Sequence, residues 1–351
     1  RPAAAIRRLQ TALAGSDDWV EGWTRLGSLL YEQDDYRDAR LAYARLTQME
    51  PRAGAAWVLL GLCDFEARDY GLSLHHLERG RAEGFPPDAT LTAVALYHQA
   101  LDLIVLGRYE QAQRLLDALG RGEASSAGQV LAQGLAALRW PVLATVAPQA
   151  LNPAGLALLR QVGAAQNLVA RRKLGAAQAI YAALVAAHAT QPGLHYAQGV
   201  VLWQAEHPAE ARRAFETELQ LSPDSDATRL QLAALLLASG ALPEALQAAE
   251  TALQHRPDSY AAHYLAGSVL LRLGRLPEAA HELEQSRDLS PESASIRYVL
   301  AQAYVRLHRA ADAAREQAAF IRLKPLQDSV LLRGTLPATV FERAAAGATH
   351  P

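Results

Sequence analysis

Four prolines recur at a constant spacing of 34 residues in the second half of the chain: Pro223, Pro257, Pro291 and Pro325. A period of this length is typical of helical hairpins that stack on one another, because a single hairpin cannot bury its apolar face alone. Such a stack has one continuous core and no closed active-site cavity, and it presents an extended surface. The spacing therefore predicts an all-α solenoid whose function is to hold another protein.

Small residues recur in the same register as the prolines. They are Gly199, Ala233, Gly267 and Ala301 in the expected first helices and Ala211, Ala245, Ala279 and Ala313 in the expected second helices. Ser225, Ser259 and Ser293 each follow a proline by two residues, where a hydroxyl suits a helix N-cap. Gly240 and Gly274 fall where a first helix ends and left-handed geometry is needed. These signals predict the helix boundaries of each unit.

The clearest unit of the first half runs from Val20 to Ala53 and shows the full pattern. Its signature residues are Trp23, Leu26, Gly27, Leu30, Ala39, Tyr43 and Pro51. A tryptophan, a Leu-Gly pair, a small alanine, an aromatic residue four positions later and a closing proline resemble the tetratricopeptide repeat (TPR). The resemblance covers about Val20 to Pro325 and implies an α-solenoid of TPR hairpins in a right-handed superhelix.

The repeat register divides the chain into five segments. We expect a partial repeat with an N-terminal helix at 1–19, TPR units 1–3 at 20–126, a degenerate repeat or irregular loop at 127–157, TPR units 4–8 at 158–325, and a C-terminal cap with a flexible tail at 326–351. Trp140-Pro141 and Asn152-Pro153 interrupt the third segment, and proline inside a helix costs about 3 kcal/mol. We interpret this segment as a decayed repeat, with a hinge or docking site as the alternative.

Composition argues against several classes of function. The formal net charge is −2, without the basic excess of a nucleic-acid binder, and we find no apolar run long enough for membrane insertion. The single cysteine, Cys63, excludes an internal disulfide and is expected to be a small buried side chain. The histidines lack the spacing of a zinc site, and no serine has a nucleophile context. We therefore predict no catalytic residue, no metal and no cofactor.

In TPR proteins the first helix of each repeat lines a concave groove, and the resemblance carries this role to the matching positions here. The residues so predicted to bind a peptide or partner are Tyr31, Phe65, Tyr97, Tyr196, Trp203, Tyr264, Tyr298, Arg272 and Arg306. Tyrosine combines a large apolar area with a hydroxyl, which suits peptide recognition. The alternative for the aromatic residues is packing between repeats. The two arginines can hold an acidic group, with solvated surface side chains as the alternative.

The predicted function is a non-enzymatic scaffold that binds a peptide or partner protein in its groove. The alternatives are a structural subunit of a larger assembly and an accessory that recruits substrates to an enzyme. The chain begins at Arg1 and contains only Met49, so we expect a processed product or a fragment. Abundant alanine and arginine favour a bacterial source, and we expect export to the periplasm or beyond, with the cytoplasm as the alternative. The oligomeric state stays open.

Overall fold

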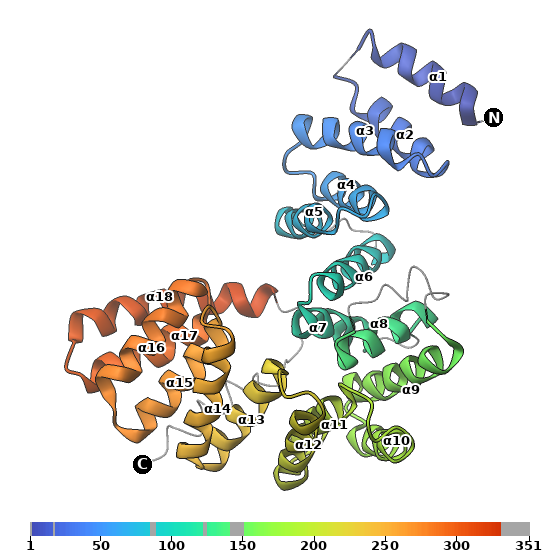
Figure 1. Cartoon of the computed structure of the whole chain (residues 1–351). Helices are drawn as coiled ribbons and strands as arrows, with labels where there is room; N and C mark the ends of the chain where they lie inside the picture. Colours follow the sequence, from blue (N-terminus) through green and yellow to red (C-terminus); the bar gives the residue numbers. More distant parts are fainter. Residues whose placement is uncertain (1, 17, 85–88, 122–124, 141–150, 331–351) are drawn as a thin grey trace. The chain divides into compact units, whose positions relative to one another are not determined.

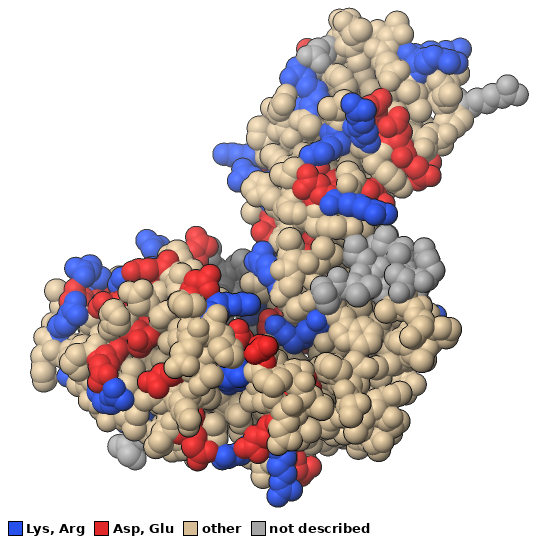
Figure 2. All heavy atoms as spheres, in the orientation of Figure 1, with Lys and Arg blue, Asp and Glu red and all other residues tan. Residues whose placement is uncertain are grey.

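The computed structural model describes residues 2–16, 18–84, 89–121, 125–140 and 151–330 (Figure 1). In these ranges the backbone forms eighteen α-helices and no strand, which confirms the all-α solenoid. The chain divides into two compact units, Arg1–Lys173 and Leu174–Pro351. Figure 2 shows acidic and basic side chains interspersed over the face in view, without a large patch of one sign.

The first unit stacks helical hairpins from α1 to α9. Their bounds are α1 (Pro2–Leu13), α2 (Val20–Tyr31), α3 (Tyr36–Met49), α4 (Gly54–Glu66), α5 (Tyr70–Glu83), α6 (Ala89–Val105), α7 (Tyr109–Gly120), α8 (Ala127–Leu138) and α9 (Pro153–Ala170). The hairpins α2–α3, α4–α5 and α6–α7 pack in sequence, and α1 packs on α2 as an isolated half-repeat. After Trp140, residues 141–150 lie outside the described ranges, so the expected irregular loop is described only at its ends.

The second unit repeats the same arrangement with more regular lengths. Its helices are α10 (Leu174–Ala187), α11 (Leu194–Gln204), α12 (Pro208–Leu221), α13 (Asp226–Ser239), α14 (Leu242–His255), α15 (Tyr260–Leu273), α16 (Leu276–Leu289), α17 (Ala294–Arg306) and α18 (Ala310–Val330). Each first helix packs on its own second helix and on the next first helix, in the order α11, α13, α15 and α17. One core therefore runs through the hairpins of this unit.

Local chemistry sets most of the predicted boundaries. The hydroxyls of Ser225 and Ser259 accept the backbone N–H three residues later, and Gly240 and Gly274 end their helices at φ of 83° and 78°. Ser293 precedes α17 but makes no such side-chain bond. Left-handed geometry favours glycine, because it has no Cβ.

Our expectation that Pro325 closes the last unit is wrong, because α18 continues to Val330. The earlier prolines lie two residues beyond the ends of their second helices and are followed by an N-cap serine two positions later. Position 327 holds glutamine, which lacks the short hydroxyl of an N-cap. Position 327 thus lacks the N-cap signal that follows the earlier prolines.

In several hairpins a small residue of the first helix meets a large residue of the second. A Cβ on Gly27 would lie 2.8 Å from the Tyr43 ring, and one on Gly267 would lie 2.6 Å from Leu283. Helices α8 and α9 approach even more closely, because a Cβ on Gly163 would lie 1.8 Å from the carbonyl oxygen of Val130. Close backbone contact therefore depends on residues without side chains at these positions.

A second recurring contact ties each first helix to the turn before it. A side-chain N–H donates to the carbonyl six residues earlier, in most units that of the closing proline. The pairs are Trp57 to Pro51, His195 to Ala189, Arg229 to Pro223, His263 to Pro257 and Arg297 to Pro291. For Trp57 the distance from Nε1 to the oxygen is 2.8 Å. This contact satisfies a carbonyl group in the loop between repeats, where no helical partner exists.

Candidate functional site

The last described repeat of the second unit contains a hollow of about 530 Å³. Its walls come mainly from α17 and α18, with part of α15 at one side. The wall residues used below are Tyr298, Gln302 and Val305 of α17 and Gln317, Phe320 and Ile321 of α18. The hollow is therefore framed by the last described hairpin of the second unit.

This wall is unusually exposed for apolar side chains. Tyr298 is 37% exposed, Val305 62% and Ile321 64%. The residues one repeat earlier, Tyr264 and Leu271, are only 4% and 7% exposed. Since the sequence period makes these positions equivalent, the difference arises from position in the stack: α15 has α17 packed beyond it. The exposed wall is the free face of the last described hairpin.

Side chains of α18 are also more exposed than the equivalent side chains of α16. Gln317 is exposed and Phe320 is partly buried, whereas their equivalents, Leu283 and Ser286, are completely buried. The exposed face thus continues across both helices of the hairpin. Contiguous apolar surface of this kind marks sites of interaction with other proteins.

Two arginines at the side of the hollow connect successive first helices. The guanidinium of Arg272 donates to the Leu237 carbonyl, and that of Arg306 donates to the Leu271 carbonyl. These carbonyls lie in the last turns of α13 and α15, where the negative end of the helix dipole favours nearby positive charge. The arginines therefore hold adjacent repeats together. Their 34-residue spacing is the sequence signal that could have indicated this role.

The structure brings together three of the nine predicted binding residues, Tyr298, Arg272 and Arg306, which all line the hollow. Tyr196 and Tyr264 are buried in the core of the second unit because neighbouring helices cover them, and Trp203 packs partly buried against that core. Packing between repeats accounts for these three side chains.

The other predicted residues lie in the first unit. Phe65 is buried, and its ring centroid lies 4.7 Å from that of His98. Tyr31 is partly buried with its ring 5.1 Å from that of Tyr36, and Tyr97 is partly buried beside His98. These contacts are internal, so they place no predicted binding residue of the first unit in a described hollow.

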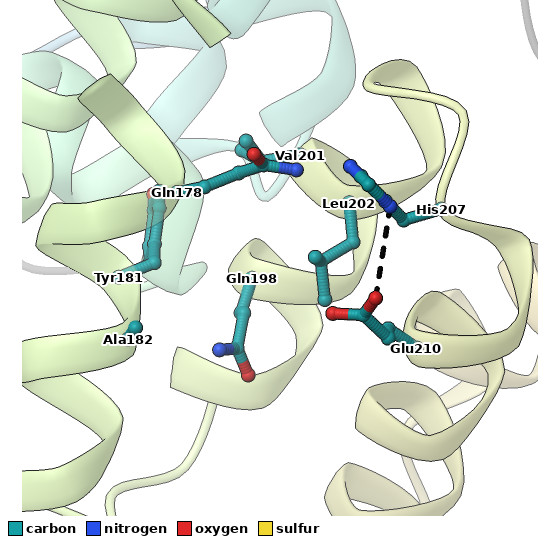
Figure 3. Close-up of a pocket in the computed structure, with 8 residues that line it drawn as sticks. All are labelled: Gln178, Tyr181, Ala182, Gln198, Val201, Leu202, His207 and Glu210. Atoms are coloured by element: carbon teal, nitrogen blue, oxygen red, sulfur yellow. Dashed lines mark ion pairs between the residues drawn. The ribbon is translucent and has the colours of Figure 1, made fainter. Parts of the chain in front are cut away.

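A smaller hollow of about 240 Å³ lies among α10, α11 and the start of α12 (Figure 3). The side chains drawn there include Gln178, Gln198, His207 and Glu210. His207 Nδ1 lies 3.6 Å from a carboxylate oxygen of Glu210, at an exposed position. The two ionisable groups face each other, and the hollow has no nucleophilic side chain beside them.

A buried polar cluster lies within the first unit. Ser73 Oγ donates to Asp102 at 2.7 Å, and Asp64 pairs with His76 at 2.6 Å and with Arg40 at 2.7 Å. Burial raises the pKa of Asp102 to about 8, with the Ser73 hydrogen bond opposing that shift. Asp64, Ser73 and Asp102 have no exposed surface, so these three side chains lie between packed helices and are closed to a substrate.

Cys63 is fully buried, as expected, and burial raises the pKa of its thiol to about 12. The thiol is therefore protonated at neutral pH and a poor nucleophile. Among the described residues, no group of three or more His, Cys, Asp and Glu side chains is arranged to hold a metal ion. None of the described helices combines the length and apolar character required to cross a bilayer.

Helical hairpins stacked on their neighbours around a continuous core define an α-solenoid repeat protein. Tetratricopeptide repeat models match residues 24–89 and 162–226, and another matches 202–267. A model described as anaphase-promoting complex, cyclosome, subunit 3 matches residues 238–316. The chain belongs to the tetratricopeptide repeat family, and it is in general terms a protein-interaction scaffold.

Several solved structures are similar to this chain. MamA 41-end from Desulfovibrio magneticus RS-1 is 21% identical with a TM-score of 0.44, and the match covers 48% of this chain and 95% of that one. A MamA RS-1 double mutant is 22% identical with the same TM-score and the same shares. YrrB, titled a TPR protein with an unusual peptide-binding site, is 13% identical, with 81% and 92% covered and a TM-score of 0.27. No match was found among curated proteins.

Proposed function

We propose that the chain is a non-enzymatic scaffold that binds a segment of a partner protein in the hollow lined by α15, α17 and α18. The observation that carries this proposal is the exposed apolar wall of Tyr298, Val305 and Ile321. Burying an apolar wall of this kind against a partner gains about 25 cal/mol per Å² of apolar surface removed from water. Arg272 and Arg306 add positive charge at its side.

The proposed site contains fewer residues than the groove expected from the sequence. Phe65, Tyr196 and Tyr264 are buried in helix packing, so replacing them would disturb the fold before it tested binding. Tyr298 is one of the predicted binding residues, and its side chain is exposed in the hollow. It is therefore the informative residue for a binding experiment.

The test uses the full chain as bait for a displayed library of random peptides, followed by affinity measurements on the selected peptides. Replacing both Tyr298 and Ile321 with alanine should weaken their binding at least tenfold. Tyr260→Ala removes an exposed tyrosine that lies outside the hollow and should leave affinity unchanged. Peptides that bind the double variant as well as the parent would refute this site.

A permanently assembled structural subunit is the second candidate. It is favoured by the match of residues 238–316 to a model of a complex subunit. Size-exclusion chromatography separates the two, because a scaffold with reversible partners should remain a soluble, folded monomer by itself. Aggregation of the purified chain, relieved by the double variant at Tyr298 and Ile321, would favour the subunit.

A further inference from the structure

We propose that the partner segment is an amphipathic α-helix that packs on α17 and α18 as the next first helix of the stack. This inference rests on the proposed function and specifies its ligand. The partner helix also carries a basic residue in its last turn, whose side chain donates to the carbonyl of Val305. The helical conformation, the packing position and the basic residue of the partner each match a contact that the repeats already make with one another.

The shape of the hollow matches a missing helix. The positions that gain exposed surface on passing from α15 to α17 line the hollow: Tyr298 and Val305 are exposed, and Gln302 is partly buried, whereas its equivalent Ser268 is buried. Their equivalents on α15 are covered because α17 packs there. A helix placed on α17 as α17 is placed on α15 would therefore cover the same positions.

The wall contributed by α18 supports the same occupant. Helix α17 also packs on α16, whose Leu283 and Ser286 are completely buried. The equivalent residues of α18, Gln317 and Phe320, line the hollow and keep exposed surface. One helix lying between α17 and α18 would contact both walls at once. Its backbone N–H and C=O groups are paired within the helix, so it can bury the apolar side chains of both walls without leaving backbone groups unpaired.

The arginine contacts define the charge of the occupant. Arg272 of α15 reaches back to Leu237 of α13, and Arg306 of α17 reaches back to Leu271 of α15. Val305 is the next position in the series of accepting carbonyls. Its oxygen accepts the backbone N–H of His308, just as the Leu271 oxygen accepts that of Gly274. A basic side chain from the occupant would complete the series.

The chain's own sequence after α18 does not carry this pattern. Continuing the register by 34 residues places Val340 where Arg306 stands and Thr335 where Ala301 stands. Pro337 falls within the same stretch, and proline is unfavourable in a helix interior. We therefore assign the occupant to a segment other than residues 331–351, and we propose that a partner protein supplies it.

The apolar pattern of the occupant is given by α17. This helix of 13 residues buries Ile296, Val299, Leu300 and Ala303, at intervals of three, one and three residues, and ends in Arg306. The partner helix should accordingly present apolar residues at helical spacing, a small residue near its centre and a basic residue at its end.

The experiment measures binding of synthetic 14-residue peptides to the full chain by fluorescence anisotropy. The parent peptide is a binder selected from a displayed library in which apolar positions follow this helical pattern and all others are random. Replacing its last-turn basic residue with methionine should weaken binding about tenfold. A proline at its centre should weaken binding about a hundredfold, because it disrupts the helix.

Variants of the protein locate the site. Ile321→Asp should weaken the parent peptide at least tenfold, whereas Leu41→Asp changes a side chain of matching exposure, 65% against 64%, on α3 of the first unit and should have no effect. Both substitutions are at exposed positions, and circular dichroism confirms that each variant is folded.

The outcomes separate this inference from the proposed function. Binding that is sensitive to Ile321→Asp but insensitive to the central proline would overturn the helical occupant and leave the binding site standing. Binding insensitive to Ile321→Asp would overturn both. Equal affinity of the arginine and methionine peptides would overturn the Val305 contact. Self-association of the chain, or binding of a peptide of residues 331–351 at this face with higher affinity than the parent peptide, would overturn the partner helix.

Discussion

The guanidinium of Arg306 donates a hydrogen bond to the main-chain carbonyl of Leu271, one repeat earlier in the stack. The same contact joins Arg272 to Leu237, so it recurs with the sequence period. In both pairs a positive charge lies at the C-terminal end of a helix, where the helix dipole favours it. Contacts between hairpins therefore recur every 34 residues, as the hairpins themselves do.

Arg272→Met should lower the stability of the second unit. The substitution keeps much of the aliphatic stem but removes the donor to Leu237, at a cost of about 1 kcal/mol for a partly exposed hydrogen bond. Urea unfolding followed by circular dichroism measures the change in midpoint. Arg213→Met, at an exposed position of α12, serves as the control, and equal losses in the two variants would contradict a specific role for Arg272.

Gly163→Ala should destabilise the first unit by about 1 to 3 kcal/mol, because the new methyl group has to displace a backbone carbonyl that lies 1.8 Å away. Gly175→Ala in α10 meets nothing within 4 Å and should stabilise the protein by about 0.5 to 1 kcal/mol through helix propensity. Thermal unfolding compares the two variants with the parent. A stabilised Gly163→Ala protein would show that α8 and α9 do not approach as described.

Trp57→Phe tests the contacts to the closing prolines. Phenylalanine preserves most of the ring but cannot donate to the Pro51 carbonyl, so the free energy of unfolding should fall by about 1 kcal/mol. Trp19→Phe, at an exposed tryptophan of the same unit, should cost less. If chemical denaturation shows equal costs, the hydrogen bond to Pro51 contributes nothing measurable.

Asp102 should make the first unit less stable as the pH rises. Its pKa is about 8 in the folded chain against an ordinary value of 3.8, so between these values the folded state retains a proton that the unfolded state has lost. Stability due to this group is complete below about pH 4 and decreases by about 1.4 kcal/mol per pH unit until about pH 8.

Asp102→Asn should remove that part of the pH dependence, because the amide is neutral and still accepts from Ser73. Tryptophan fluorescence is a suitable probe, since four of the five tryptophans belong to the first unit. Denaturation midpoints between pH 5 and 8 should decline less in the variant than in the parent. Parallel declines would assign the dependence to other groups.

The fold could be predicted from the sequence because proline, serine and glycine recur at fixed positions. Each of these residues sets a helix end through its own backbone geometry or through a hydrogen bond to a nearby backbone group, so its effect is local. The sequence could not predict which groove positions are exposed. Tyr264 and Tyr298 occupy the same place in the period, yet one is buried and the other forms the wall of the hollow. Their difference depends on whether another helix packs beyond them, and a local pattern contains no such information.

The contacts to the closing prolines were readable from the sequence but were not recognised. Trp57 resembles the signature tryptophan Trp23 of the preceding unit, whereas the equivalent positions in later units hold His195, Arg229, His263 and Arg297. What these side chains share is an N–H donor, and hydrophobicity does not reveal it. Aligning the repeats by donor groups as well as by apolar residues would have found this contact.

The exposed end formed by α17 and α18 has a consequence for local motion. Among the described residues, this hairpin has a packed neighbour hairpin on one side, whereas α15 and α16 have neighbours on both. In a stack of this kind each repeat is stabilised by its nearest neighbours. The hairpin of α17 and α18 should therefore fray first, and its amide hydrogens should exchange with deuterium sooner than those of α15 and α16. A partner that binds there would slow that exchange. Binding could therefore be detected from the exchange rates of amide hydrogens in α17 and α18 that the partner does not contact.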